Sequence, residues 1–332
     1  MENITYKALV VEEDGNRYSR KIKELTTEHL FSYGDVLIRV YYSSLNYKDA
    51  LSATGNKGVT KNYPHTPGID AAGVVIASNN EKFQSGEKVI VTGYDLGMNT
   101  PGGFGEYICV PSDWIVKLPE GLTLKESMII GTAGFTAGIS LTRLTELVSP
   151  DMGEIIVSGG TGGVGSMSLS MLAKLGYQTV AITGKITEKS FFETIGCHKI
   201  LPRSEFESLP QKPILSAKYA GGIDTVGGGI LENIIKQIQP LGAVTTCGSI
   251  HSTELNISVF PFILRGISLI GVSAQNYPMN LREKLWKKLA ADWKPEQLLN
   301  LYTEISLPQL SEAIDNMLQG KLKGRILVNL TA

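Results

Sequence analysis

The strongest constraint on this chain of 332 residues is a glycine-rich run that directly follows a short apolar stretch. Residues 155–158 read Ile-Ile-Val-Ser, and residues 159–165 read Gly-Gly-Thr-Gly-Gly-Val-Gly, which contains the pattern G-x-G-x-x-G. Between a strand and a helix, this pattern makes a tight turn and brings the backbone close to a pyrophosphate at the helix N-terminus. The run predicts a dinucleotide-binding turn, with a glycine-rich loop that holds no ligand as the alternative. The residues expected to contact the cofactor are Thr161, Gly162, Gly163 and Val164.

The residues around this run strengthen the interpretation. Apolar residues recur at helical spacing from Val164 to Leu175, and Gly176 is placed to end that helix. Five further strand-like runs follow, at 179–183, 199–201, 222–226, 243–247 and 269–272. Strands that alternate with helical segments are typical of a doubly wound parallel sheet. The sequence therefore predicts an α/β Rossmann domain over residues 126–276.

The remainder of the chain has a different texture. The first 120 residues or so hold short β-branched runs, such as Val36–Tyr42 and Lys88–Val91, separated by glycine-containing turns. This pattern predicts an antiparallel barrel or sandwich. The tail from about Tyr277 is helical and polar, and it closes with a strand at Arg325–Val328 that could return to the first domain.

Composition excludes several classes of protein. The chain has 31 Lys and Arg against 32 Asp and Glu, so no basic excess points to nucleic acid or to a membrane surface. No apolar run reaches the roughly 18 residues that span a bilayer, and no apolar segment follows the N-terminus as in a signal peptide. We therefore expect a cytoplasmic protein. The three cysteines are far apart and predict neither a disulfide scaffold nor a structural zinc site.

The end of the second Rossmann strand indicates which dinucleotide binds. NAD-preferring domains place an Asp or Glu there to bond the ribose 2′-hydroxyl, and this chain has no acidic residue between Glu154 and Glu188. The strand instead ends in Thr183-Gly184-Lys185, and Arg203 follows the next strand. A hydroxyl, a glycine and two cations suit a 2′-phosphate. We expect NADP(H) rather than NAD, with Lys185 and Arg203 as solvated surface charges in the alternative interpretation.

Several motifs resemble one known family over nearly the whole chain. They are Ser44-Leu45-Asn46-Tyr47-Lys48-Asp49, Pro67-Gly68-Ile69-Asp70-Ala71-Ala72-Gly73, Gly131-Thr132-Ala133-Gly134-Phe135-Thr136-Ala137, the glycine loop and Pro261-Phe262-Ile263-Leu264-Arg265-Gly266. In these motifs the chain resembles the zinc-independent medium-chain dehydrogenase/reductase superfamily, in the branch of acrylyl-CoA reductases and YhdH/YhfP-type quinone oxidoreductases.

The resemblance implies an architecture and an assembly. A GroES-like, β-rich catalytic domain would comprise residues 1–125 and 277–332, with the Rossmann NADP-binding domain inserted between them and the active site in the cleft. Members are commonly homo-oligomers joined through the last Rossmann strand, here near Leu269 to Ser273, and we expect a dimer.

The resemblance also argues against a metal. Zinc relatives hold a catalytic ion with a Cys and a His, where this chain has Asn46 and Ile69. An amide and an alkyl group do not replace a thiolate and an imidazole as zinc ligands. His65 lies near this loop, but a single histidine is more often structural. We expect no metal.

Without a metal, reduction of a carbon–carbon double bond conjugated to a carbonyl is easier than alcohol or ketone chemistry. The candidate catalytic residues are Tyr47, which could bond the nicotinamide ribose or carboxamide and donate toward the substrate, and Asn46, a neutral donor for the substrate carbonyl. Lys48 and Asp49 could pair and fix the loop. In the alternative interpretation this stretch is a surface turn, with Tyr47 packed on the core.

The resemblance implies further cofactor contacts, by backbone or by side chain. They lie in the loop after the fifth strand, in the Pro-Phe-Ile-Leu-Arg motif, after the sixth strand and in the tail: Ser249, Ile250, Ile263, Ala274 and Asn316.

The expected function is that of an NADPH-dependent reductase of a short activated alkene, acrylyl-CoA or a similar enoyl thioester. Lys57, Lys61 and Arg265 are the cations available for the phosphates of such a substrate. An NADPH quinone oxidoreductase would use the same cofactor site, and a non-catalytic NADPH-binding sensor would bind without turnover. A methyltransferase is disfavoured because it needs an acid at the end of the second strand.

Overall fold

The computed structural model describes residues 3–332, which divide into two compact units. The first holds the residues up to Thr132 together with Gln275–Ala290 and Tyr302–Ala332, and the second holds Ala133–Ala274 and Ala291–Leu301. Within the described residues, no helix is long and apolar enough to cross a bilayer.

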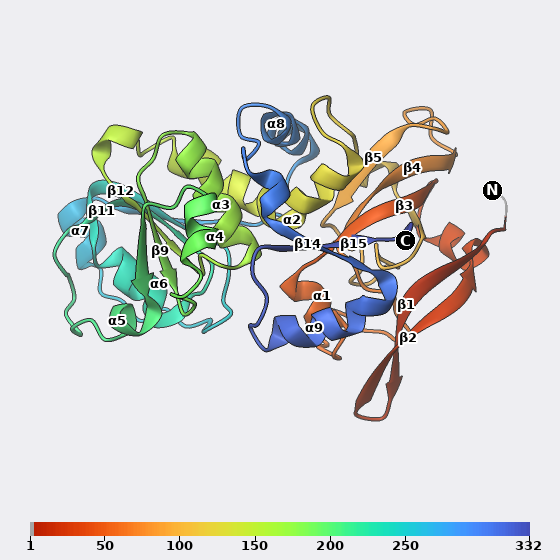
Figure 1. The fold of residues 1–332 in the computed structure, drawn as a ribbon, viewed down its shortest axis with the longest axis horizontal. Helices are drawn as coiled ribbons and strands as arrows, with labels where there is room; N and C mark the ends of the chain where they lie inside the picture. The colour runs from red at the N-terminus through yellow and green to blue at the C-terminus, as the bar shows by residue number, and fades with distance from the viewer. Residues whose placement is uncertain (1–2) are drawn as a thin grey trace. The chain divides into compact units, whose positions relative to one another are not determined.

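A seven-stranded sheet organises the first unit (Figure 1). Its order is β14-β15-β3-β4-β5-β7, with β6 also paired to β3, while β1 and β2 form a separate antiparallel hairpin. All pairs in the larger sheet are antiparallel except β14 with β15. The strands are β1 (Thr5–Asp14), β2 (Arg17–Thr26), β3 (Val36–Leu45), β4 (Asp70–Ser78), β5 (Lys88–Thr92), β6 (Tyr107–Val110), β7 (Ile115–Lys117), β14 (Tyr302–Ser306) and β15 (Arg325–Asn329).

Strand β3 lies in the middle of this sheet, and its side chains are buried on both faces. Successive side chains of a strand point to opposite faces. Val36 and Ile38 join the larger core of the unit, while Leu37 joins a smaller core with Tyr6. The closing strand β15 pairs antiparallel with β3, so the tail returns to the N-terminal part of the chain. The helices of this unit are α1 (Tyr47–Ser52), α8 (Met279–Ala290) and α9 (Leu310–Leu318).

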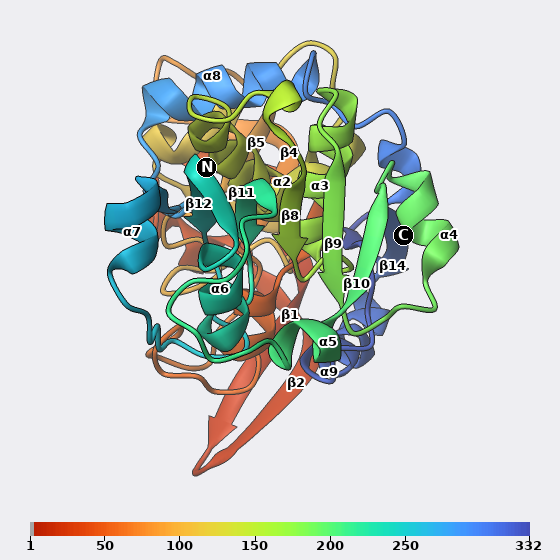
Figure 2. The ribbon, with the colours of Figure 1, turned by 90° about the vertical axis from the view of Figure 1, so that its left-hand side faces the viewer.

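The second unit contains a six-stranded parallel sheet in the order β10-β9-β8-β11-β12-β13 (Figure 2). The predicted Rossmann sheet is confirmed, and the order reverses between β8 and β11, where such sheets bind ligands. The strands are β8 (Ile155–Ser158), β9 (Thr179–Thr183), β10 (Lys199–Pro202), β11 (Tyr219–Asp224), β12 (Ile238–Thr246) and β13 (Ser268–Gly271). The helices are α3 (Gly163–Lys174), α4 (Lys189–Thr194), α5 (Arg203–Glu207), α6 (Gly228–Ile235) and α7 (Phe260–Arg265).

The boundaries between the units differ from the predicted ones in three places, of which the smallest puts residues 275–276 in the first unit. Helix α2 (Leu124–Leu144) is kinked at Gly131, whose φ is 50°, and the division falls just after this kink. Residues 291–301 were expected in the catalytic domain but belong to the second unit. There the Lys174 ammonium of α3 donates a 2.8 Å hydrogen bond to the carbonyl of Lys294. A sequence pattern does not reveal such a contact, because it joins residues 120 positions apart.

Candidate active site

The glycine loop lies between β8 and α3, as predicted. Gly159 adopts a φ of 63°, and its carbonyl accepts a 2.8 Å hydrogen bond from the amide of Gly162. A Cβ atom on Gly165 would lie 2.3 Å from the carbonyl oxygen of Gly159, so only glycine allows the helix to pack this closely. The first amides of α3 have no acceptor inside the helix. The loop therefore packs closely on the start of α3, whose free amides can bind a pyrophosphate.

Two cationic residues lie at the carboxyl ends of the neighbouring strands β9 and β10. The hydroxyl of Thr183 accepts a 3.0 Å hydrogen bond from the amide of Lys185. A Cβ atom on Gly184 would lie 3.0 Å from a guanidinium nitrogen of Arg203. The structure thus brings Thr183, Gly184, Lys185 and Arg203 together at one corner of the sheet. Within the described residues, no carboxylate lies within 4 Å of the Arg203 guanidinium.

A pocket of about 420 Å³ lies at the carboxyl ends of β12 and β13. It is lined by Thr246, Cys247, Gly248, Ser249, Gly271, Val272 and Ser273. Ser249 is therefore in the pocket, and Ala274 follows its last lining residue. Ile250 and Ile263 are 62 % and 67 % exposed, and the pocket lining does not include them. Asn316 belongs to α9 of the first unit.

Sequence reasoning missed Asp224, the last residue of β11. Its buried carboxylate accepts hydrogen bonds from Ser158 of β8 (2.8 Å), Thr246 of β12 (3.0 Å) and the amide of Gly227 (3.0 Å). One side chain thus ties the carboxyl ends of three strands together. Burial raises the pKa of Asp224, while its hydrogen bonds lower it. An acidic residue that ends an otherwise buried strand is the sequence pattern that could have revealed it.

The first unit contributes the segment from Asn46 to Asp49, which begins α1. The Asp49 carboxylate accepts 2.8 Å hydrogen bonds from the amides of Asn46 and Ile69. These bonds fix the start of the helix against the loop before β4. The sequence suggests that Lys48 pairs with Asp49, but the structure shows otherwise. The Lys48 ammonium donates a 2.9 Å hydrogen bond to the side-chain oxygen of Gln275. Tyr47 remains 37 % exposed.

The side chain of Asn46 is occupied by a buried polar cluster. Its amide nitrogen donates to Asp70 at 2.8 Å, to the carbonyl of Ser44 at 3.2 Å and to Asp49 at 3.3 Å. Its oxygen accepts a 3.2 Å hydrogen bond from Arg325. Asn46 is only 9 % exposed. Within this unit, the arrangement leaves the Asn46 amide no free hydrogen for another acceptor.

Asp70 is the acceptor at the centre of this cluster and is fully buried. Ser44 donates to it at 2.6 Å, and the amide of Thr132 at 2.9 Å. A Cβ atom on Gly131 would lie 2.7 Å from this carboxylate, which explains the glycine at the kink of α2. Among the described residues, no group of three or more His, Cys, Asp or Glu side chains could hold a metal ion.

Two of the cations suggested for substrate phosphates have partners within their own units. Lys57 forms an ion pair with Glu13 at 2.7 Å, and its ammonium lies 4.7 Å from the ring centre of Tyr63. Arg265 donates at 2.9 Å to the carbonyls of Lys236 and Ile238, so it holds the backbone of the second unit. A role of Lys57, Lys61 and Arg265 toward substrate phosphates stays a prediction.

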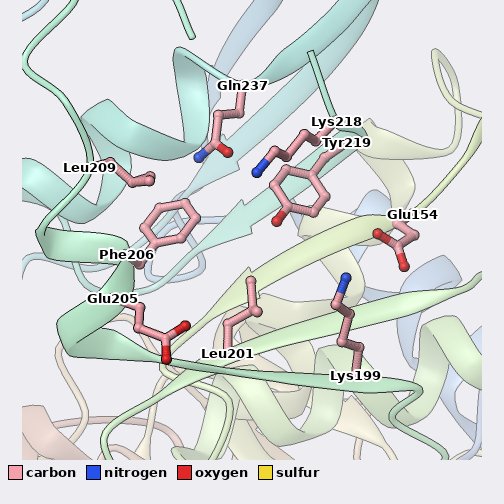
Figure 3. Close-up of a pocket in the computed structure, with 9 residues that line it drawn as sticks. All are labelled: Glu154, Lys199, Leu201, Glu205, Phe206, Leu209, Lys218, Tyr219 and Gln237. Carbon is pink, nitrogen blue, oxygen red and sulfur yellow. The ribbon is translucent and has the colours of Figure 1, made fainter. Parts of the chain in front are cut away.

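A second pocket, of about 440 Å³, lies at the opposite edge of the parallel sheet (Figure 3). Lys199, Lys218 and Gln237 lie at or just before the amino ends of β10, β11 and β12, and Phe206 comes from α5. The glycine loop and the corner at Arg203 follow the carboxyl ends of strands. This pocket is therefore not part of the predicted cofactor site.

Comparison with known proteins agrees with this arrangement. The profile of the Alcohol dehydrogenase GroES-like domain matches residues 32–120. The chain is 34 % identical to the acrylyl-CoA reductase AcuI of Ruegeria pomeroyi, over 98 % of this chain and all of that protein. It is 40 % identical to YhfP of Bacillus subtilis, which is named for a proposed quinone oxidoreductase activity, over 98 % of this chain and 99 % of YhfP.

Crystal structures of two relatives hold a dinucleotide. That of Escherichia coli YhdH with bound NADPH has a TM-score of 0.94 and 38 % identity, and covers 97 % of this chain and 99 % of that one. That of Bacillus subtilis YhfP with bound NAD has a TM-score of 0.95 and 39 % identity, over 98 % of this chain and 99 % of that one.

Proposed function

The chain belongs to the medium-chain dehydrogenase/reductase superfamily, and on this premise we propose that it is an NADPH-dependent reductase of an activated carbon–carbon double bond. Acrylyl-CoA or a similar short enoyl thioester is the proposed substrate. The observation that carries the proposal is a glycine loop and a cationic corner on one Rossmann unit, in a chain that is 34 % identical to an acrylyl-CoA reductase over 98 % of its residues.

NADPH fits the residues present at the carboxyl edge of the parallel sheet. The amides of Gly163 and Val164 would hold the pyrophosphate. The turn of the loop has no room for a Cβ atom at several of its glycines, so no side chain there keeps the pyrophosphate away from the backbone. Lys185 and Arg203 would hold the 2′-phosphate. YhfP binds NAD in its crystal structure, so the preference for NADPH rests on these two cations and on the missing acid.

The described residues of the first unit do not offer the donor set of a catalytic zinc site. Asn46 is bound to two carboxylates and an arginine, and Ile69 offers only its backbone amide, which donates to Asp49. Zinc requires thiolate, imidazole or carboxylate ligands that are free to coordinate it. A metal-independent reaction is therefore proposed.

When bound, NADPH supplies a hydride for the β-carbon of the alkene. The substrate carbonyl then gains negative charge, which a hydrogen-bond donor must stabilise. Tyr47, exposed at the start of α1, is proposed to contact the cofactor and to orient it. The carboxylate of Asp49 fixes that segment through the amides of Asn46 and Ile69.

Reduction of a quinone is the second candidate, because YhfP is named for it. A quinone would use the same cofactor site. A protein that binds NADPH without turnover is the third outcome that an assay must separate.

A homodimer is part of the proposal. Strand β13 is the last strand of its sheet, and its outer edge has no neighbour among the described strands. Nearby on α7, Ile263 and Leu264 are 67 % and 66 % exposed. An unpaired strand edge beside exposed apolar side chains supports pairing with a second copy. Sedimentation of the protein as a monomer at micromolar concentration would contradict this.

The test of the function compares four mixtures: NADPH or NADH, each with acrylyl-CoA or with a simple quinone. Oxidation of the reduced nicotinamide is followed by absorbance. Turnover confined to NADPH with the thioester supports the proposal. Turnover with the quinone alone supports the second candidate, and NADPH binding without turnover supports the third.

A further inference from the structure

The proposed reaction leaves one chemical need without an assigned residue. A hydride from bound NADPH, which is oxidised to NADP⁺, would form a C–H bond at the β-carbon while the π bond of the alkene breaks, so that negative charge collects on the substrate carbonyl oxygen. A proton from solvent later returns to the α-carbon. During this reaction the oxygen requires a hydrogen-bond donor, and in other enzymes the loss of one such donor costs about 10²- to 10³-fold in kcat.

Asn46 is the residue predicted for that role, but its side-chain amide already donates to other acceptors. Both of its hydrogens point to acceptors within the first unit, chiefly Asp70 at 2.8 Å. Turning the amide toward a substrate would remove one of the donors of the buried Asp70 carboxylate, which is costly in a dry interior. This favours a donor at a neighbouring residue of the same segment.

Lys48 has the free hydrogens that Asn46 lacks. Its ammonium carries three, and within residues 3–332 its only hydrogen-bond partner is the side-chain oxygen of Gln275, at 2.9 Å. No carboxylate in the described chain lies within 4 Å of it, because Asp49 is turned toward the amides of Asn46 and Ile69. Two hydrogens remain for a ligand.

The surroundings of Lys48 hold it in place. The carbonyl of Gln275 accepts hydrogen bonds from the amide of Tyr94 at 2.9 Å and from the fully buried Arg282 at 3.1 Å. Arg282 also donates to the carbonyl of Thr92 at 2.8 Å, so Gln275 is anchored to β5 and α8. A half-buried ammonium on an anchored partner is a preorganised donor. Burial lowers the pKa of Lys48, and Asp49 and Asp95 oppose this shift.

We propose that the Lys48 ammonium donates a hydrogen bond to the carbonyl oxygen of the substrate and stabilises the charge that forms there. This role rests on the proposed enoyl reductase function. Lys48 keeps its proton throughout, so the hydride and the solvent proton account for both hydrogens added to the alkene. Gln275 is the corresponding positioning residue, because it fixes the ammonium without needing to touch the substrate.

The test replaces Lys48 by methionine, which has a similar length and no charge, and by arginine, which keeps the charge. We expect Lys48→Met to lower kcat with acrylyl-CoA about 10²- to 10³-fold. The Kd for NADPH, measured by fluorescence, should change less than twofold. Lys48→Arg should recover at least tenfold of the lost kcat. The matched control is Lys82→Met, since Lys82 pairs with Asp113 on the surface and should leave kcat unchanged.

Each outcome decides the proposal. A Lys48→Met enzyme with kcat within threefold of the active wild type overturns the role of Lys48 alone. Loss of NADPH binding in a variant that melts like wild type makes Lys48 a cofactor ligand and also overturns it. A wild type that turns over no unsaturated thioester overturns both the proposed function and this role.

Discussion

The side-chain amide of Asn46 donates a 2.8 Å hydrogen bond to the fully buried carboxylate of Asp70. Arg325 lies 3.9 Å from the same carboxylate and donates to Asn46 from the other side. Asn46 is thus a neutral side chain that links two carboxylates and a guanidinium in the buried part of the first unit.

The first prediction concerns the charge at this position. Asn46→Asp keeps the shape and the acceptor for Arg325, but it removes the donor and places a third carboxylate beside Asp49 and Asp70. We expect the free energy of unfolding to fall by on the order of 3 kcal/mol, the usual cost of breaking a buried charged network. Urea denaturation measures it.

Asn300→Asp is the control for this change, because Asn300 is exposed and bonds only Gln297. Its effect should stay within about 0.5 kcal/mol. If Asn46→Asp were equally mild, the buried cluster would not contribute to stability as argued.

The second prediction concerns the pH dependence of stability. Burial and the nearby Asp70 raise the pKa of Asp49 to about 7, from 3.8. Between these two values the folded protein holds the Asp49 proton more tightly than the unfolded chain does, so the free energy of unfolding falls as pH rises. The largest slope from one such group is about 1.4 kcal/mol per pH unit.

Asp49→Asn removes this titration. The free energy of unfolding of the wild type, minus that of the variant, should therefore fall from about pH 4 to pH 7 and stay constant above pH 7. Urea denaturation across this range measures the difference. A constant difference throughout would show that Asp49 keeps an ordinary pKa.

The third prediction concerns the glycine loop. In Gly165→Ala the new Cβ would lie 2.3 Å from the carbonyl of Gly159, so the loop or the helix must move. We expect a loss of about 1–3 kcal/mol in stability, as for other overpacked sites, and weaker binding of NADPH. In Gly229→Ala the new methyl group meets nothing within 4 Å, and both quantities should remain near wild type. Thermal melting and fluorescence titration of both variants test the comparison.

The extent of sequence prediction can be judged from particular elements. The strands at 155–158 and 179–183 were predicted with the observed bounds, because buried parallel strands are continuous apolar runs with clear glycine boundaries. Strand β12 begins at Ile238 rather than at 243, since Gln239, Pro240 and Gly242 hide its start. Ile238 pairs with Tyr219 of β11, and the register then shifts before Gly221 pairs with Ala243, so the strand is irregular between Ile238 and Ala243.

The candidate site was less accessible from sequence. Thr183, Gly184, Lys185 and Arg203 could be predicted as neighbours because parallel strands end at one edge. The hydrogen bonds of Asn46 with Asp70 and Arg325 could not be predicted, since these residues are 24 and 279 positions away from it. The same holds for the contact of Lys48 with Gln275, which joins residues 227 positions apart. Long-range polar partners leave no periodic pattern in the sequence.

The last prediction tests the cationic corner. If Lys185 and Arg203 hold the 2′-phosphate, Lys185→Ala should weaken NADPH binding by on the order of 1.5–3 kcal/mol, the worth of a charge-assisted hydrogen bond, and leave NADH almost unaffected. Arg203→Ala should act in the same direction, because its guanidinium lies against Gly184. Fluorescence titration with each cofactor gives both Kd values. The control is Lys189→Ala, an exposed lysine at the start of α4 that should change neither. Equal losses for NADPH and NADH would mean that these cations bind a part common to both cofactors, and the assignment of the 2′-phosphate would fall.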